Sequence, residues 1–196
     1  MIVLQDEEVI RLVVDGHTQA YSIIVDRYKN MIYDICYKYT YDYTEAQDLS
    51  QDIFLKVYRK LYTFKNSSSF CTWLYRIGIN TCIDWTRKNK KRSDIKYIDE
   101  DGFIEALPSS SPTPEDIALD VEKRELVRSA ILNLSEKYKT VVILYNYKNL
   151  SCGEISQILD IPVKTVETRL YRAKKILKDK LLRPCSGGEY LWNAAK

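Results

Sequence analysis

Basic side chains dominate residues 163–183, which hold eight Lys and Arg residues against two acids. Such a density of cations suits phosphate binding, and arginine can also pair with guanine edges. Apolar residues recur among them every three or four positions, which is the spacing of one helix face. We therefore expect a helix that packs its apolar side on its own domain and turns its basic side to DNA. The apolar positions are Val163, Val166, Leu170, Ala173 and Leu177.

A short helix and a tight turn precede this basic helix. Ser151 and Glu154 have the spacing of a capping box, and Pro162 suits the first turn of the next helix. A short helix, a turn and a longer basic helix form the helix-turn-helix pattern, whose second helix lies in the major groove. A basic helix alone often only faces solvent, but the capped helix before it favours DNA binding. The predicted DNA-contacting residues are Lys164, Thr165, Glu167, Thr168, Arg169, Arg172 and Lys175.

A second set of candidate nucleic-acid contacts lies in residues 70–92. Asn80, Asp84, Arg87 and Lys88 recur at helical spacing and form a polar ridge that ends in a basic run. Aromatic rings beside such groups suit single-stranded nucleic acid, because rings stack on bases and cations follow the backbone. The polar loop at 64–69 is suited to accept a base taken out of the stack. Alternatively, Trp73 and Trp85 are ordinary core residues, and we expect this for at least one of them.

Acidic residues cluster at the start of the helix expected near 45–62. Asp48, Gln51, Asp52 and Leu55 lie outside the centre of its apolar face. Acids near a helix amino end stabilise it locally, which is one explanation. The other is a docking face for a basic partner surface.

The composition is that of a globular protein, with 45% hydrophobic and 29% charged residues in 196 and a net charge of only +3. The charge is segregated, since residues 99–122 hold eight acids and no base. Five cysteines without a CxxC pair, together with a single histidine, argue against a structural zinc and favour reduced thiols in the cytosol. No apolar run is long enough for a membrane span, and we expect neither a metal nor a cofactor.

Helical periodicity covers most of the chain, and strand-like alternation is absent. We expect an all-α fold of two helical domains, at residues 1–95 and 115–183. Residues 96–114 are acidic and rich in Pro and Ser, and they predict a flexible linker. Residues 184–196 are expected to be a flexible tail. The expected helices lie near residues 5–14, 17–40, 45–62, 69–91, 115–133, 136–148, 151–159 and 163–182.

Three stretches, in this order, resemble the extracytoplasmic-function sigma factors of bacterial RNA polymerase. They are DLSQDIFLKVY, FCTWLYRIGINTCIDWTRK and LSEKYKTVVILYNYKNLSCGEISQILDIPVKTVETRLYRAKK. The resemblance spans roughly residues 17–92 and 128–182. It implies a cytoplasmic alternative sigma factor, and not an enzyme, that directs core RNA polymerase to promoter DNA and begins strand opening. It further implies an anti-sigma partner and a linker that threads near the polymerase active cleft.

The resemblance also implies a role for each candidate surface. The helix at 163–175 would read the minus-thirty-five element of the promoter. Asp48, Gln51, Asp52 and Leu55 would dock on core polymerase. Asp160 stands where the family often has Gly, and Ser135 replaces a frequent Pro and can serve as an N-cap. The residues implied at the minus-ten element are Phe64, Lys65, Asn66, Trp73, Arg76, Asn80, Asp84, Arg87 and Lys88.

Two other classes of function stay open from the residues alone. A stand-alone helix-turn-helix regulator would use the same basic helix, but such proteins usually dimerise and no dimer seam is evident. An enzyme acting on nucleic acid is the least favoured, because we find no clustered nucleophile or metal ligands and only one histidine, His17.

Overall fold

The computed structural model describes residues 4–89 and 114–182, and within these ranges every regular element is helical. The predicted all-α fold is confirmed. Most of the expected linker and all of the expected tail lie outside the described residues. The elements are α1 (Asp6–Val14), η1 (Thr18–Ala20), α2 (Tyr21–Thr40), α3 (Tyr43–Lys60), η2 (Leu61–Thr63), α4 (Phe70–Asn89), α5 (Pro114–Leu132), α6 (Glu136–Val142), the π-helical turn η3 (Ile143–Tyr147), α7 (Cys152–Leu159) and α8 (Val163–Leu181).

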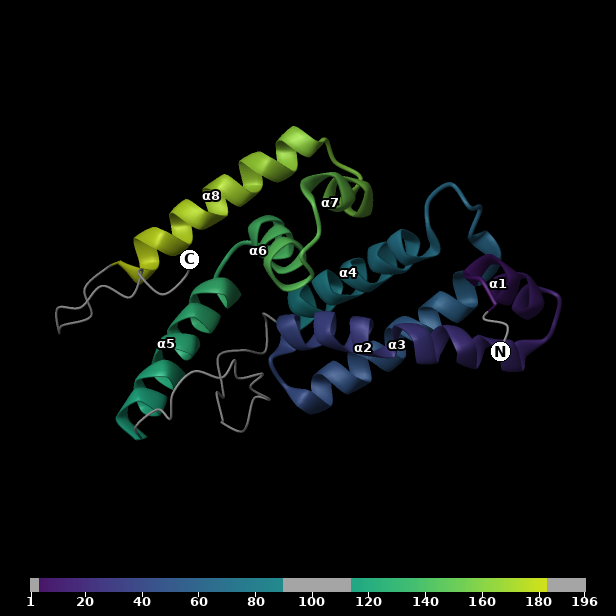
Figure 1. Ribbon diagram of the computed structural model, residues 1–196, viewed down its shortest axis with the longest axis horizontal. Helices are drawn as coiled ribbons and strands as arrows, with labels where there is room; N and C mark the ends of the chain where they lie inside the picture. Colours follow the sequence, from purple (N-terminus) through teal and green to yellow (C-terminus); the bar gives the residue numbers. More distant parts are fainter. Residues whose placement is uncertain (1–3, 90–113, 183–196) are drawn as a thin grey trace.

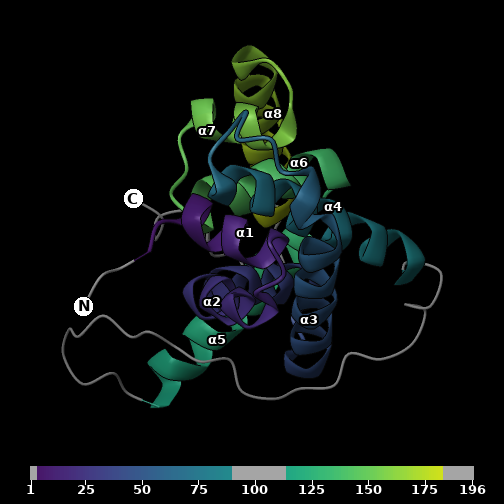
Figure 2. The ribbon, with the colours of Figure 1, turned by 90° about the vertical axis from the view of Figure 1, so that its right-hand side faces the viewer.

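Helices α1–α4 form the amino-terminal bundle (Figure 2). Its interior consists of aliphatic side chains at helical spacing, and Ile32, Ile53 and Leu74 have no exposed surface. At Gly78, α4 packs directly on α2, and a Cβ there would lie at ordinary contact distance, 3.4 Å, from Cδ1 of Ile32. This bundle holds α3 and α4 rigidly, so the polar faces of both helices are presented at fixed positions.

Helices α5–α8 form the carboxy-terminal group. Ile155 of α7 and Val166 of α8 are fully buried and belong to the same core cluster as Val141 of α6. A second small cluster packs α6 against the later turns of α8. The two clusters fix α8 along most of its length on one side only, which leaves its opposite side facing solvent.

The two groups of helices share one hydrophobic core, and α4 packs against α7 (Figure 1). A buried hydrogen bond of 2.8 Å joins the hydroxyls of Tyr39 on α2 and Thr140 on α6. Lys139 is only 1% exposed, and its ammonium lies 4.8 Å from the centre of the Tyr39 ring. At the rim, Lys148 and Asp34 form an ion pair of 2.7 Å. The two halves, α1–α4 and α5–α8, are therefore packed against each other, and we call this arrangement closed.

Several local expectations needed correction. The helix expected over 136–148 changes to a π-helical turn after Val142. Val163 was expected in the buried stripe of the basic helix but is 43% exposed, because it lies in the first turn, at the edge of the packed surface. Pro162 is the N-cap residue of α8 and not its first helical residue. Ser135 does occupy the N-cap position of α6, but its side chain makes no capping hydrogen bond.

Candidate nucleic-acid interface

The capping box predicted at Ser151 and Glu154 fixes the start of α7. The Ser151 hydroxyl accepts from the Glu154 backbone N–H at 3.2 Å, and the Glu154 carboxylate accepts from the Ser151 N–H at 2.8 Å. The hydrogen bonds from Ser151 hold the pKa of Glu154 below its ordinary value. The negative side chain also complements the positive end of the helix.

The turn between α7 and α8 sets the angle at which α8 leaves the domain. Asp160 adopts the left-handed conformation, with φ of 53°, at the position where the family often has Gly. The Ser156 hydroxyl donates to the Ile161 carbonyl at 2.6 Å, and the Pro162 carbonyl then accepts from the Thr165 N–H at 2.8 Å. Because these bonds satisfy backbone groups on both sides of the turn, the two helices are joined rigidly.

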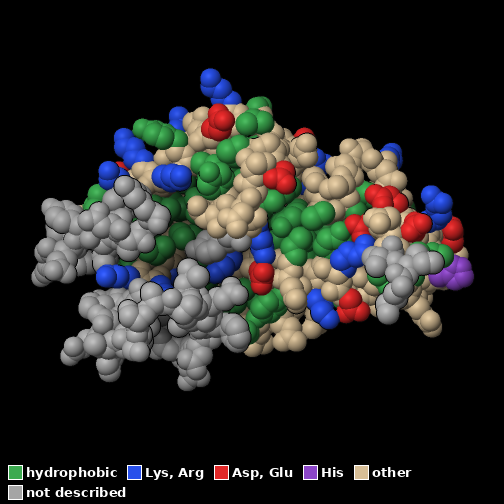
Figure 3. Space-filling view, viewed as in Figure 1, with side chains coloured by type: hydrophobic (Ala, Val, Ile, Leu, Met, Phe, Trp, Pro, Cys, Tyr) green, Lys and Arg blue, Asp and Glu red, His purple; other side chains and the backbone are tan. Residues whose placement is uncertain are grey.

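The predicted DNA-contacting residues of α8 divide into two groups. Thr165 and Arg169 are half-buried on the side of α6, and the others are exposed. The Thr168 hydroxyl donates to the Lys164 carbonyl at 2.7 Å, so Thr168 presents chiefly its methyl group and its hydroxyl oxygen. Figure 3 shows Lys and Arg side chains gathered over α8. The exposed members are Lys164, Glu167, Thr168, Arg172 and Lys175.

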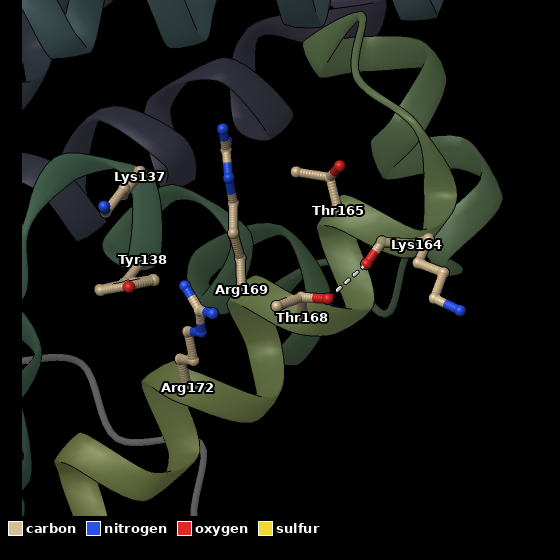
Figure 4. Close-up of a pocket in the computed structure, with 7 residues that line it drawn as sticks. All are labelled: Lys137, Tyr138, Lys164, Thr165, Thr168, Arg169 and Arg172. Atoms are coloured by element: carbon tan, nitrogen blue, oxygen red, sulfur yellow. Dashed lines mark hydrogen bonds between the residues drawn. The ribbon is translucent and has the colours of Figure 1, made fainter.

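A notch of about 270 Å³ separates α8 from the start of α6 (Figure 4). Arg169 and Arg172 rise from α8 on one side of the notch, and Lys137 of α6 lies on the other. The ring of Tyr138 forms part of its wall, and no acidic side chain lines it. The complete lining is Lys137, Tyr138, Lys164, Thr165, Thr168, Arg169 and Arg172. This arrangement of cations around open space is suited to an anionic group.

On α4, the predicted polar ridge is fully accessible. Asn80, Asp84, Arg87 and Lys88 are all exposed. Asp84 and Arg87 form an ion pair of 3.7 Å whose side chains are 60% and 71% exposed. Pairs at this exposure contribute little to stability, so both side chains can exchange their contact for a nucleic acid.

The predicted base-accepting loop begins at an aromatic cluster. The Phe64 ring lies 5.4 Å from Trp73 and 5.5 Å from Phe70, measured between centroids. Trp73 is half-buried in this cluster, as is Trp85 at its own position on α4, so each has both core and surface character. Beyond the cluster Lys65 and Asn66 are exposed, and Asn66 adopts a positive φ of 54°. The rings anchor the loop, and its polar tip faces solvent.

Arg76 occupies a position that the sequence did not predict. Its Nε and Nη2 atoms donate to the Gln157 carbonyl of α7 at 3.0 Å and 2.6 Å. A residue implied at one promoter element is therefore held by the helix-turn-helix implied at the other. The ridge residues of α4, by contrast, are exposed to solvent.

The outer face of α3 carries the predicted docking residues together. Asp48, Gln51, Asp52 and Leu55 are all exposed, and Leu55 is 54% exposed although it is apolar. Leu49, Ile53 and Val57 face the core on the other side of the helix. An exposed leucine beside two carboxylates is suited to a partner surface with an apolar centre and basic edges.

Comparison with known families matches both halves of the chain. Residues 24–92 match the model described as Sigma-70 region 2, and residues 124–177 match the model described as Sigma-70, region 4. The ECF RNA polymerase sigma factor SigW of Bacillus subtilis (strain 168) is 36% identical over 176 residues, which cover 88% of this chain and 94% of that protein.

The chain belongs to the extracytoplasmic-function sigma factors of RNA polymerase.

This sigma factor directs core RNA polymerase to specific promoters and initiates DNA strand opening. The ECF RNA polymerase sigma-E factor of Escherichia coli (strain K12) is 32% identical over 183 residues, which cover 91% of this chain and 95% of that protein. Because these relatives match across both regions, a stand-alone helix-turn-helix regulator is not supported.

Two solved structures share the fold of this sigma factor. CnrH, in complex with the cytosolic domain of CnrY, has a TM-score of 0.63 at 22% identity, over 89% of this chain and 95% of that one. The sigma factor RpoE from Bartonella quintana, in complex with the anti-sigma factor NepR, has a TM-score of 0.59 at 20% identity, over 82% and 96%. At these identities the likeness establishes the arrangement of helices alone.

Three surface residues near α8 escaped the sequence analysis of this sigma factor. Lys137 and Tyr138 line the notch but lie on α6, and no local pattern links α6 to α8. Tyr171 is 71% exposed on the outer side of α8. Tyr171 lies three residues after Thr168 and four before Lys175, and this spacing places it on the same helix face as these predicted DNA contacts. It was not predicted because an apolar ring at helical spacing was not interpreted as a surface group.

The described part of this sigma factor shows no cluster of three or more His, Cys, Asp and Glu side chains that would hold a metal ion. None of its described helices is long and apolar enough to cross a membrane. Cys36 and Cys82 are buried and pack as small hydrophobic residues, whereas Cys71 is half-buried.

Proposed function

We propose that this sigma factor acts through three separate surfaces, on α3, α4 and α8. Residues 1–95 carry core-polymerase docking and the minus-ten contacts, residues 115–183 carry the minus-thirty-five contacts, residues 96–114 link them, and residues 184–196 form a tail. The exposed face of α3, with Asp48, Asp52 and Leu55, holds the chain on core polymerase. Its charge and its apolar centre support this role.

The exposed side of α8 reads the minus-thirty-five element as duplex DNA. An α-helix fits the major groove, and the buried apolar stripe of α8 leaves its basic side free to enter. Arg172 contacts a base edge, and Lys175, further along the helix, contacts phosphate. Glu167 accepts from a cytosine amine. This set of contacts needs no strand separation.

The ridge of α4 captures unpaired bases at the minus-ten element. Asn80 and Asp84 hydrogen-bond to separated bases, while Arg87 and Lys88 contact the backbone beside them. The tip of the loop at 64–69 takes one base out of the stack. Because these contacts exist only with melted DNA, binding energy favours the open state, and this chain supplies no catalytic group of its own.

The closed arrangement must open before both elements are bound. The minus-ten and minus-thirty-five elements lie about 25 base pairs apart, or about 85 Å at ~3.4 Å per pair. In the described structure, by contrast, Arg76 of α4 touches Gln157 of α7. Opening exposes part of the shared core, so a large partner must cover it. Core polymerase takes this role, and the free chain is therefore a weak DNA binder.

A regulatory partner also fits this mechanism. The family resemblance and the two related structures, which are complexes with CnrY and with the anti-sigma factor NepR, support an anti-sigma factor that binds this chain in the cytoplasm. Such a partner would keep the promoter-reading surfaces from DNA.

The observation that carries this proposal is the separate exposure of the α3 face, the α4 ridge and the basic side of α8, each on a helix that is packed within its own half of the chain. The test is run-off transcription from a random promoter library with purified bacterial core polymerase. Core polymerase with this chain should produce discrete transcripts that share two sequence elements, and core polymerase alone should not. If the chain neither joins core polymerase nor yields selected promoters, the proposal fails.

A further inference from the structure

We infer that Lys137 of α6, together with Arg169 of α8, forms a binding site for one phosphate of the DNA backbone beside the minus-thirty-five element. This inference rests on the proposed function of α8. It adds a residue from outside the helix-turn-helix and gives Arg169 a role in positioning rather than in base reading.

The notch between α6 and α8 has the size and charge for a phosphodiester. Its volume of about 270 Å³ has room for about nine waters at ~30 Å³ each. Lys137 lies on one side, Arg169 and Arg172 lie on the other, and no acidic side chain lines the space between them (Figure 4). A phosphate entering the notch therefore meets positive charge from two helices and replaces solvent.

The position of Lys137 is set by packing. Its ammonium lies 5.0 Å from the centre of the Tyr138 ring, within the range of a cation–π contact. Tyr138 in turn packs on the buried cluster of Leu134, Val142 and Ala173, which joins α6 to α8. Lys137 is exposed, yet the ring beside it ties its charge to the same rigid body that carries the reading helix.

The dimensions of DNA indicate that Lys137 contacts a phosphate and not a base. The major groove is about 12 Å wide, and an α-helix with its side chains is about 10–12 Å across. With α8 in the groove no space remains for a second helix, so a residue on neighbouring α6 meets the sugar-phosphate wall and not the base edges. Arg169 is half-buried and faces the same notch, so it meets the same strand.

The first test compares holoenzymes on a promoter selected with the wild-type chain. Each phosphate contact contributes about 0.9 to the slope of log K against log salt. Lys137→Ala should lower the slope by about 0.9 and weaken binding about eightfold at ~0.1 M salt, equally for promoters of different sequence. Lys137→Arg should restore the slope. Lys123→Ala, which removes an exposed lysine of α5 outside the notch, is the matched control and should change neither quantity.

The second test locates the phosphate. Neutral methylphosphonate is placed at each backbone position of the minus-thirty-five element in turn. At one position the loss measured with the wild-type holoenzyme should be clearly smaller with Lys137→Ala, because part of that contact is already lost, while the losses at other positions should be the same for both. An unchanged salt slope, or additive losses at every position, would overturn the inference while leaving the proposed function intact. If the wild-type chain formed no promoter complex with core polymerase, the proposed function itself would fail.

Discussion

The surfaces on α8 and α4 differ in how ready they are to bind. On α8, Arg172 is exposed, Tyr171 is 71% exposed, and the turn that aims the helix is closed by its own hydrogen bonds. On α4, Asn80 and Asp84 are exposed, but Arg76 is held by the carbonyl of Gln157 in α7. The surface proposed for duplex DNA is complete, whereas the surface proposed for melted DNA is completed only when the two halves separate.

This difference assigns each surface to a step of initiation. A reader of duplex DNA can act at the first encounter, since its target needs no rearrangement. A surface that binds separated bases has no target until the strands open. Before that step, Arg76 can therefore hydrogen-bond to the Gln157 carbonyl of α7. The contact between α4 and α7 thus links the shape of the chain to the step that it has reached.

Removing the α4 side chains that are proposed to contact unpaired bases should have the largest effect, and the effect should be on promoter opening. The double substitution Asn80→Ala and Asp84→Ala should lower the ratio of open to closed complexes about 30-fold, since two contacts of ~1 kcal/mol each are lost from the melted state alone. Permanganate reactivity of unpaired thymines measures opening, and gel retardation measures recruitment, which should stay within about twofold. Normal opening by this variant would remove the assignment of the α4 ridge.

Removing a base contact on α8 should give the complementary result. Arg172→Ala should weaken recruitment about tenfold, because a good base contact contributes about 1–3 kcal/mol. The ratio of open to closed complexes should be unchanged once DNA is bound. Titration at fixed salt gives the affinity, and Lys123→Ala serves as the control. A variant that binds normally but opens poorly would reverse the roles of the two surfaces.

The buried hydrogen bond between the halves allows the closed arrangement to be weakened without touching either surface. Tyr39→Phe removes the hydroxyl that pairs with Thr140 at 2.8 Å. It should lower the free energy of unfolding by about 1 kcal/mol and shift the closed–open balance about fivefold toward open. Thermal unfolding checks stability, and DNA binding by the free chain checks opening.

The matched control for this loosening is Tyr62→Phe. Tyr62 is 76% exposed, so loss of its hydroxyl should change neither stability nor DNA binding. Equal behaviour of the two variants would mean that the contact between Tyr39 and Thr140 does not hold the halves together.

Lowering the pH should slightly reduce the contribution of the Ser151–Glu154 capping box to the free energy of unfolding. The pKa of Glu154 is lowered by its hydrogen bonds with Ser151, so its contribution is present above the ordinary glutamate pKa of about 4.3 and is lost as pH falls through the lower folded-state value. Glu154→Gln should therefore flatten the fall in stability below about pH 5. Chemical denaturation at several pH values measures this, with Glu7→Gln on α1 as the control. Parallel curves for wild type and Glu154→Gln would contradict it.

Local patterns predicted the elements and the direction of the polar faces. The Ser151–Glu154 box, the spacing of Leu49, Ile53 and Val57, and the stripe through Val166 and Leu170 depend on residues within a few turns of one another. Such spacing marks a helix and its buried side without knowledge of the rest of the fold. It failed at Val163, where the partner surface ends.

Contacts between distant segments were not predictable in this way. Lys139 reads as a surface residue, yet it is buried because Tyr39, a hundred positions earlier, covers it. Two further contacts likewise depend on how the helices pack. They are the hydrogen bond from Arg76 to the Gln157 carbonyl and the position of Lys137 across the notch from Arg169. Periodicity gives the face that a helix buries, but it does not give the helix that will cover that face.

The distance between the two halves tests the central claim most directly. Site-specific labels that do not use cysteine can be placed at exposed Thr44 of α3 and Ser129 of α5, close to the hydrogen bond of 3.1 Å from Arg128 of α5 to the Tyr41 carbonyl. The free chain should give one short distance, and the promoter complex with core polymerase should give a distance longer by tens of ångströms. The same distance in both states, or a long distance in the free chain, would contradict a closed form that opens on the polymerase.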